Sequence, residues 1–270
     1  MTYGFLGAGR MATAIIRGML SAGVCSKTDI VVSDTDEAKL DLIGSETGVI
    51  SRSSNRQVAE EADVLLLCVK PDEVLAALRG CGELSSSTLL VSIAAGVTIG
   101  RLETIAVGCR VVRVMPNTPA LIHRGAAAYA LGTHALESDA DIVQEIFSAV
   151  GLALRVDERH LDAVTGLSGS GPAFVYLMVE ALADGGVAAG LPRQMALQLA
   201  AQTLAGGALM VLETGEHPAI LKENVASPGG TTIAGLQVLE DRGLRGILMQ
   251  GVLKATNRSR EIGVDLARSL

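Results

Sequence analysis

The chain has 270 residues with 22 basic and 29 acidic side chains, so its formal net charge at neutral pH is −7. Aromatic residues make up only 2% and tryptophan is absent. Both features argue against nucleic-acid binding, which needs clustered positive charge and often stacking rings. The length allows one large domain or two ordinary ones with a substantial core.

Apolar residues make up 49% of the chain, yet no uninterrupted apolar run approaches the length of a membrane span. Arg10 and Arg17 lie inside the first apolar region, which does not fit a secretory signal. The four cysteines form no Cys-x-x-Cys pair, and the four histidines show no metal-ligand spacing. We therefore expect a cytoplasmic protein with reduced thiols and no bound metal.

A short apolar strand near the amino terminus runs into Gly7-Ala8-Gly9, and a helical apolar pattern follows at once. The spacing Gly7-x-Gly9-x-x-Ala12 matches the glycine fingerprint of a dinucleotide site. Gly7 allows a sharp turn, Gly9 leaves room for a pyrophosphate, and Ala12 lets the helix approach the strand. The helix N-terminus adds free N–H groups and a partial positive charge for the phosphates.

The glycine pattern alone is weak evidence, because 31 of the 270 residues are glycine and such a turn is often only structural. A second apolar run, Ile30–Ser33, strengthens the prediction because it ends at Asp34. Asp34 follows the fingerprint by about 20 residues, where an acidic group accepts hydrogen bonds from the adenosine ribose. We predict a nucleotide site here, with a structural turn as the alternative.

Three later apolar runs end in small, proline or amide-bearing residues. Continuous apolar runs are typical of parallel strands that are covered on both faces, and ligands bind at the carboxyl ends of such strands. Ordinary loop chemistry explains any one of these endings, but three together favour a cofactor-lined cleft. The runs are Val64–Val69 before Lys70-Pro71, Leu89–Ile93 before Ala94-Ala95-Gly96, and Arg110–Met115 before Pro116-Asn117. Residues 126–131 and 153–156, which flank a helix at 138–150, are further strands of the predicted sheet.

From about Asp157 the strand-like runs stop and long helices rich in alanine and leucine follow. We predict two domains, an α/β domain over residues 1–157 and an all-α domain over residues 158–270. The helix Pro172–Ala189 is apolar nearly all round, so it must be covered on all sides. A helical domain of this size covers such a helix most easily by packing it against a second subunit. We therefore expect an obligate homo-oligomer.

A glycine- and hydroxyl-rich loop, Ser227-Pro228-Gly229-Gly230-Thr231-Thr232, lies within the helical half and leads into a predicted helix at 231–241. Gly229 and Gly230 bring bare backbone close to a ligand, and Thr231 and Thr232 fall at the helix start, where N–H groups attract an anion. A capped helix start without a ligand is the alternative, and the physics of the loop alone does not choose between them.

As a string of residues this loop closely resembles the hallmark segment of the pyrroline-5-carboxylate reductase family. Further segments resemble that family's motifs in order, over residues 5 to about 260. They are Phe5–Ala12, Val69–Pro71, Ser92–Gly96, Arg113–Asn117 and Leu167–Ala173.

The resemblance implies a Rossmann-type domain with a mostly parallel, doubly wound sheet, followed by a helical dimerisation domain interleaved with its partner's. It implies a homodimer, often in a ring of dimers such as a decamer. The implied enzyme is an NAD(P)H-dependent oxidoreductase that reduces the C=N bond of Δ1-pyrroline-5-carboxylate to L-proline, the last step of proline biosynthesis.

The resemblance also assigns residues. Thr232 matches the family's imine-facing threonine, so it is the expected catalytic residue, hydrogen-bonded to the ring nitrogen. The expected ligands of the substrate carboxylate are Ser227, Gly229, Gly230 and Thr231. The resemblance places Gly7, Gly9, Arg10, Met11 and Ala12 at the pyrophosphate, Asn55 near the adenosine ribose, and Lys70, Ala94 and Asn117 towards the nicotinamide. Asp34 joins the expected cofactor-binding residues at the ribose through its distance from the fingerprint, not through the resemblance.

Asp34 departs from the family's pattern, because members often carry Asn-Arg-Ser or similar residues that suit a 2′-phosphate. Asp34-Thr35-Asp36 offers two carboxylates and no arginine, and would repel that phosphate. We expect NADH to be preferred over NADPH, or discrimination to be weak. Two other functions stay open, a reductase of related architecture acting on another imine or a β-hydroxyacid, and a non-catalytic nucleotide sensor.

Overall fold

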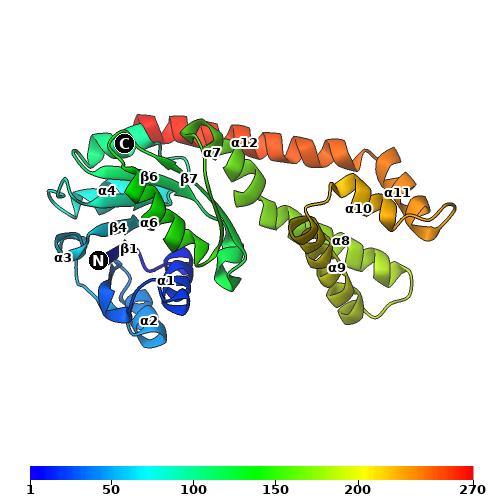
Figure 1. The fold of residues 1–270 in the computed structure, drawn as a ribbon, viewed down its shortest axis with the longest axis horizontal. Coiled ribbons are helices and arrows are strands. Elements are labelled where there is room, and N and C mark those ends of the chain that lie inside the picture. Colours follow the sequence, from blue (N-terminus) through cyan, green and yellow to red (C-terminus); the bar gives the residue numbers. More distant parts are fainter. Residues whose placement is uncertain (270) are drawn as a thin grey trace. The chain divides into compact units, whose positions relative to one another are not determined.

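The structure is a computed structural model that describes residues 1–269. The chain divides into two compact units (Figure 1). The sheet unit comprises Met1–Ser170 together with the chain from Leu253 onward, and the helical unit comprises Gly171–Val252. The last helix begins in the helical unit and ends in the sheet unit.

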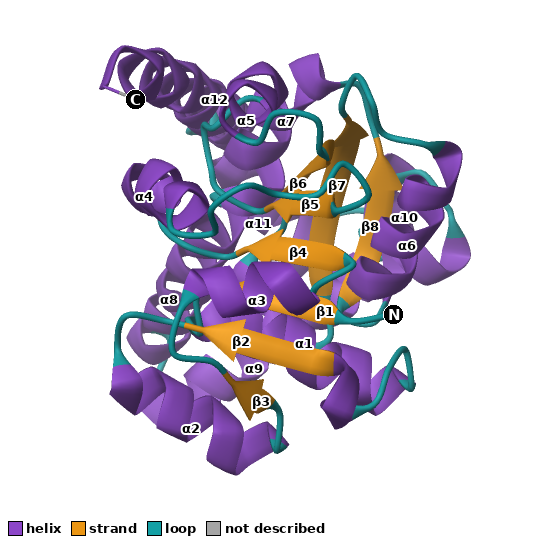
Figure 2. Ribbon diagram, turned by 90° about the vertical axis from the view of Figure 1, so that its left-hand side faces the viewer, coloured by secondary structure: helices purple, strands orange, loops and turns teal. Residues whose placement is uncertain are grey.

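One eight-stranded sheet forms the centre of the sheet unit, with the strand order β3-β2-β1-β4-β5-β6-β7-β8 (Figure 2). All neighbouring strands are parallel except β6 and β7, which pair antiparallel. This is the mostly parallel, doubly wound sheet that the sequence predicts. The strands are β1 (Tyr3–Leu6), β2 (Ile30–Ser33), β3 (Ile50–Ser51), β4 (Val64–Leu67), β5 (Leu89–Ser92), β6 (Arg110–Met115), β7 (Gly125–Leu131) and β8 (Gly151–Arg155).

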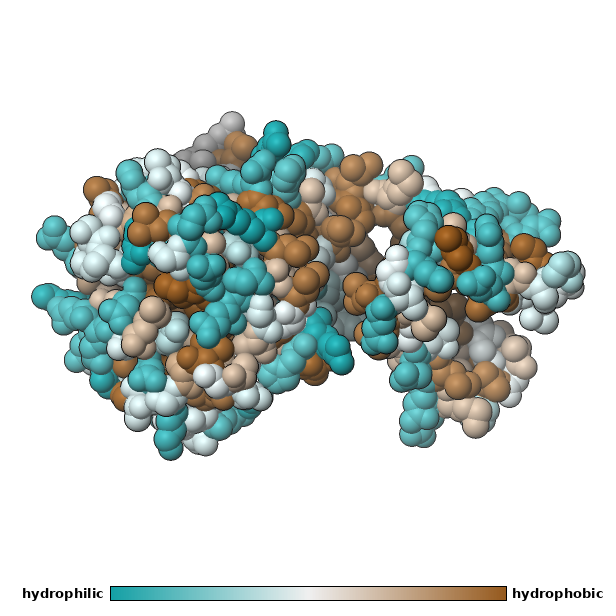
Figure 3. All heavy atoms as spheres, in the orientation of Figure 1, coloured by the Kyte–Doolittle hydropathy of each residue, from teal (hydrophilic) through white to brown (hydrophobic). Residues whose placement is uncertain are grey.

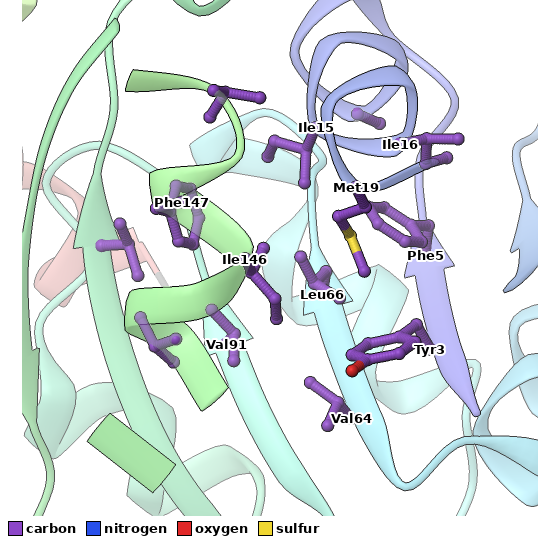
Figure 4. Close-up of a cluster of buried hydrophobic side chains, with 14 of the residues drawn as sticks. Tyr3, Phe5, Ile15, Ile16, Met19, Val64, Leu66, Val91, Ile146 and Phe147 are labelled. Carbon is purple, nitrogen blue, oxygen red and sulfur yellow. The ribbon is translucent and has the colours of Figure 1, made fainter. Parts of the chain in front are cut away.

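Helices cover both faces of the sheet and produce two separate apolar layers. One layer packs α1, α2 and α6 against strand residues such as Phe5, Leu66 and Val91 (Figure 4). The other packs α3, α4, α5 and α7 against the alternate residues, such as Leu65 and Leu90. Because both sides of each central strand are buried, the strands read as continuous apolar runs. The helices are α1 (Arg10–Ala22), α2 (Glu37–Thr47), α3 (Asn55–Glu61), α4 (Val74–Arg79), α5 (Ile99–Ile105), α6 (Glu137–Ser148) and α7 (Leu161–Val164).

The order of connection reverses at β1, which sets the place of a ligand site. The chain first moves from β1 outward to β2 and β3, and then returns to pair β4 on the other side of β1. Such a reversal opens a crevice at the carboxyl ends of the strands. The turn after β1 lies at this point.

The helical half that the sequence predicts does not begin with one continuous helix. A short 3-10 turn (Glu158–His160), the helix α7 and a π-helical turn (Thr165–Gly169) take its place. The Asn117 side chain donates to the Ser168 carbonyl at 3.0 Å, and Ser170 N donates to the Thr165 carbonyl at 2.8 Å. The wider turn therefore follows from contacts with the end of β6, which the helical periodicity does not reveal.

The helical unit buries very little of its own apolar surface. It contains α8 (Gly171–Ala188), α9 (Arg193–Thr214), α10 (Pro218–Asn224), α11 (Thr231–Asp241) and the first part of α12 (Leu244–Ser269). Among its described residues only Ala183, Ala196 and Ala200 form a buried apolar cluster. Figure 3 shows apolar side chains on the surface of this unit. Apolar surface of this extent needs a covering partner.

α9 is long and apolar enough to cross a membrane by its length and composition alone. Polar residues such as Gln198, Gln202 and Thr203 interrupt it, so the sequence shows no continuous apolar run. Its neighbour α8 is as exposed, since Tyr176 and Leu177 are 63% and 65% accessible. Both helices therefore have the surface of a subunit interface.

Gly4 allows α3 to lie close to β1, because a Cβ atom there would come within 2.7 Å of Val58 Cγ1 and of Ala62 Cβ. We expect Gly4→Ala to lower the free energy of unfolding by about 1–3 kcal/mol through overpacking. Gly100→Ala is the control, because a Cβ on that exposed glycine in α5 would meet nothing within 4 Å. Chemical denaturation measures the free energy of unfolding of both variants. Equal values for the two would contradict the expected close packing.

Candidate functional site

A pocket of about 340 Å³ lies in the sheet unit at the carboxyl ends of β1, β2 and β4. Its volume falls in the range of ligand sites, roughly 300–1,000 Å³. Five of the ten predicted cofactor residues line it, namely Gly7, Gly9, Asp34, Asn55 and Lys70. Its other lining residues are Ser33, Thr35, Lys39, Cys68, Val69, Glu73, Ala76 and Ala77.

The two glycines of the fingerprint have different roles. Gly7 has φ +101°, and a Cβ there would lie 2.9 Å from the Cys68 carbonyl oxygen. Gly7 N also donates to the Ser33 carbonyl at 2.7 Å. A Cβ on Gly9 would meet nothing within 4 Å, so Gly9 lies open to the pocket. The fold thus requires glycine at position 7, whereas at position 9 the absent side chain leaves room for a ligand at the start of α1.

Asp34 holds the fingerprint loop in place. Its Oδ2 accepts a hydrogen bond from Ala8 N at 2.8 Å, and its Oδ1 accepts one from Asp36 N at 2.9 Å. The side chain is only 10% exposed. Because a carboxylate has about four acceptor positions, it keeps capacity for ribose hydroxyls after these two bonds.

Lys39 is a charged residue of the pocket that the sequence analysis missed. Its Nζ lies 3.6 Å from Asp34 Oδ1 and 3.5 Å from Asp36 Oδ2, one turn into α2. The negative charge of Asp34, followed by that of Asp36, raises the pKa of Lys39, so its ammonium group stays charged. The signal was available in the sequence, because residues 36 and 39 are neighbours on one helix face.

Asn55 joins β2 to α4 on the same side of the pocket. Its Oδ1 accepts from Ser33 Oγ at 2.8 Å, and its Nδ2 donates to the Ala77 carbonyl at 3.1 Å. Its side chain therefore has a fixed orientation where it borders the pocket. On the far side of β1, Lys70 is exposed after β4, and its backbone N–H donates to Glu73 Oε2 at 3.2 Å.

Cys68 lines the pocket without offering a reactive thiol. Its side chain packs against the apolar layer of α1 and α6, and this burial raises the pKa of the thiol to about 12. A thiol with that pKa stays protonated near neutral pH and is a poor nucleophile.

The other five predicted cofactor residues do not line this pocket. Arg10 and Met11 are exposed and half-buried at the start of α1, and Ala12 is buried in the core. Ala94 is buried after β5. Asn117 uses its amide within the protein, because its Oδ1 accepts from Ala126 N at 2.8 Å while its Nδ2 donates to Ser168.

The predicted substrate loop lies in the helical unit, at the start of α11. Gly229 has φ +66°, and Gly230 N donates to the Ser227 carbonyl at 3.0 Å, so the loop turns tightly. The Ser227 hydroxyl folds onto Gly230, where a Cβ would overlap it. The first backbone bond of α11 runs from Ala234 N to Gly230 O at 3.3 Å. The N–H groups of Thr231 and Thr232 precede that bond and lie at the positive end of the helix.

Among the described residues, no group of three or more His, Cys, Asp and Glu side chains could hold a metal ion. The charged groups of the pocket are Asp34, Lys39, Lys70 and Glu73. Together with the open backbone at Gly9, they suit an organic ligand that carries phosphate and hydroxyl groups.

Each half of the chain matches a different family model, and full-length relatives span both halves. Residues 158–262 match the family model described as pyrroline-5-carboxylate reductase dimerisation. Residues 2–96 match a model described as NADP oxidoreductase, coenzyme F420-dependent. The pyrroline-5-carboxylate reductase of Arabidopsis thaliana is 47% identical over 260 residues, which cover 96% of this chain and 94% of that protein.

Solved structures agree over the same length. A pyrroline-5-carboxylate reductase from Coxiella burnetii has a TM-score of 0.90 and 34% identity, covering 97% of this chain and 98% of its own. The Plasmodium falciparum pyrroline carboxylate reductase, solved with NADP bound, has a TM-score of 0.87 and 33% identity over the same shares.

The two fingerprint glycines give a test that separates folding from binding. We expect Gly9→Ala to weaken dinucleotide binding by roughly tenfold or more, since a methyl group would occupy the space for the pyrophosphate. Its melting temperature should stay that of the wild type, because the methyl group meets no protein atom. Gly7→Ala, by contrast, should unfold at a lower temperature. Titration calorimetry with NAD⁺ and thermal unfolding measure the two effects, and full affinity in Gly9→Ala would contradict the assignment.

Proposed function

Since the chain belongs to the pyrroline-5-carboxylate reductase family, we propose that its 227–232 loop binds the imine substrate and that its glycine-lined pocket binds the dinucleotide. The enzyme is an NAD(P)H-dependent oxidoreductase of proline biosynthesis. The functional conclusion rests on the similarity of nearly the whole chain to reductases that share this one activity. The residue roles rest on the geometry of the two sites.

The loop suits the carboxylate of a small amino-acid-like substrate. We assign the carboxylate to the N–H groups of Gly229, Gly230 and Thr231, with the Ser227 hydroxyl as an added donor. Gly230 N already donates to the Ser227 carbonyl within the loop. In the proposed complex this N–H group is therefore shared between that carbonyl and the substrate carboxylate. The N-terminus of α11 adds a favourable field for the anion.

Thr232 is the proposed catalytic residue. Its hydroxyl hydrogen-bonds the ring nitrogen, which orients the imine and gives a proton a path to that nitrogen. The reaction adds a hydride to the C=N carbon and a proton to the nitrogen, so that the double bond becomes a single bond and the dinucleotide is oxidised. Because the protonated imine is already electrophilic, catalysis consists mainly of alignment, and a strong acid–base pair is not required.

The pocket residues fit a dinucleotide, because the missing Cβ of Gly9 leaves the backbone open at the start of α1. When bound, the dinucleotide supplies the hydride from C4 of its nicotinamide ring. We assign the pyrophosphate to the stretch from Gly7 to Ala12 and the adenosine ribose to Asp34 and Asn55. Lys70, Ala94 and Asn117 belong to the nicotinamide side, where Asn117 acts by holding the 165–169 turn against β6.

The enzyme is a homo-oligomer, because the part of the chain with uncovered helices is the part that matches the dimerisation family. When a second subunit covers its apolar side chains, α9 is an interface helix of a soluble enzyme. We propose that the functional domains divide at residues 157 and 158, that dimers assemble further into a decameric ring, and that the enzyme works in the cytoplasm. The family match that begins at residue 158 supports the first of these assignments.

We further propose that NADH is the preferred cofactor. Asp34 is held by two backbone N–H groups and is nearly buried, so it cannot turn away from a ligand at the end of β2. A fixed carboxylate accepts hydrogen bonds from ribose hydroxyls and repels a 2′-phosphate.

The role of Thr232 predicts a selective loss of turnover. Thr232→Ala should lower kcat with pyrroline-5-carboxylate by roughly 10²-fold, because the ring nitrogen loses its hydrogen-bond partner. Cofactor affinity should stay close to that of the wild type. Thr232→Ser keeps a hydroxyl and should recover most of the rate. Steady-state kinetics and dinucleotide titration measure both quantities, and an unchanged rate in Thr232→Ala would rule the role out.

The cofactor assignment predicts a higher kcat/KM with NADH than with NADPH. The difference should be modest, less than about tenfold, because charges at a partly exposed site are screened by water and salt. Initial rates of pyrroline-5-carboxylate-dependent oxidation of the two cofactors, measured side by side, give the ratio. A much lower KM for NADPH would refute the preference. Cofactor binding without turnover of either one would point to another imine or to nucleotide sensing.

A further inference from the structure

Three charged side chains meet at the end of β2, where the adenosine ribose is assigned. Asp34 and Asp36 each carry a negative charge, and Lys39, in the first turn of α2, offsets one of the two. The repulsion of a 2′-phosphate by the two carboxylates is therefore opposed by the attraction of the Lys39 ammonium group.

The two carboxylates are fixed and Lys39 is not. Asp34 accepts from Ala8 N and Asp36 N, and Asp36 accepts from Ala38 N at 3.1 Å as the N-cap of α2. The Lys39 ammonium lies 3.5–3.6 Å from both carboxylates, longer than a close charge-assisted hydrogen bond of about 2.7–2.9 Å. Its side chain is 48% exposed. Lys39 is therefore free to turn towards a stronger anion at small energetic cost.

Lys39 also lies on the correct side of the pocket. Lys70, the other cation that lines it among the described residues, follows β4 on the opposite side of β1. The nearby arginines of α3 and its preceding loop have acidic partners, since Arg52 pairs with Glu61 and Arg56 pairs with Glu60.

We propose that Lys39 is the specificity-determining residue through which this enzyme accepts a 2′-phosphate. With NADPH its ammonium leaves the carboxylate pair and contacts the phosphate. With NADH it stays over Asp34 and Asp36 while the ribose hydroxyls bond Asp34. This inference rests on the proposed dinucleotide site and accounts for the modest size of the NADH preference that we expect.

The test compares Lys39→Met, which removes the charge, with Lys39→Arg, which keeps it. Lys27→Met is the matched control, because Lys27 packs over Gly48 in the same unit and does not line the pocket. The binding probes are adenosine 2′,5′-bisphosphate and AMP, measured by calorimetry at low and moderate salt. Initial rates with NADPH and NADH are measured on the same variants.

Lys39→Met should bind adenosine 2′,5′-bisphosphate about tenfold more weakly, as expected for the loss of one partly exposed contact between an ammonium group and a phosphate. AMP binding and kcat/KM with NADH should change less than about twofold. Lys39→Arg and Lys27→Met should stay close to the wild type. The difference between the wild type and Lys39→Met should shrink as salt is added.

Equal losses for both probes, or no loss for the bisphosphate, would overturn the role of Lys39. That result is separate from the NADH preference, which depends on the wild-type ratio alone. A third result is that the wild type prefers NADPH while Lys39→Met loses affinity for NADPH and the bisphosphate only. Lys39 then keeps its role, and the proposed rejection of the 2′-phosphate by Asp34 is wrong.

Discussion

The path of the backbone as it leaves β1 is the constraint on which the rest of the sheet unit depends. Cys68 N donates to the Leu6 carbonyl at 2.8 Å on one side, and Gly7 N donates to the Ser33 carbonyl on the other. One residue later, Ala8 N donates to Asp34. Because β1 lies between β2 and β4, a change in this turn reaches both neighbouring strands. The positive φ of Gly7 makes the turn possible, and the opening at Gly9 results from it.

The same turn gives the Asp34 carboxylate a structural role beside the cofactor-selecting role that we propose for it. Asp34 must stay oriented towards Ala8 N to hold the turn, so its side chain cannot move away from the end of β2 without loosening the fingerprint. In the proposed site, the positive charge of Lys39 on α2 moderates the repulsion between Asp34 and a phosphate. Structural and functional demands on this residue are therefore inseparable.

The helical unit obeys a different constraint, the removal of apolar surface from water. Its helices bury three alanines against one another and leave large side chains such as Tyr176, Leu177 and Leu212 exposed in a single chain. Covering them with a second copy provides the missing burial. Assembly is thus a condition of stability for the unit that carries the 227–232 loop, so the stability of this unit depends on the concentration of subunits.

The sequence by itself determined the elements whose signals are local. β2, β6 and α11 have the bounds that their apolar runs and helix start predict, and the fingerprint identified Gly7 and Gly9. Only the tertiary structure decided the antiparallel direction of β7, the two-residue strand β3 and the π-helical turn before α8. These features depend on hydrogen bonds between distant segments, such as the one from Asn117 to Ser168, which no local periodicity encodes. The sequence places Lys39 beside Asp36 on one helix face, but only the tertiary structure fixes Asp34 next to it, because Ala8 N, 26 residues before Asp34, holds that carboxylate in place.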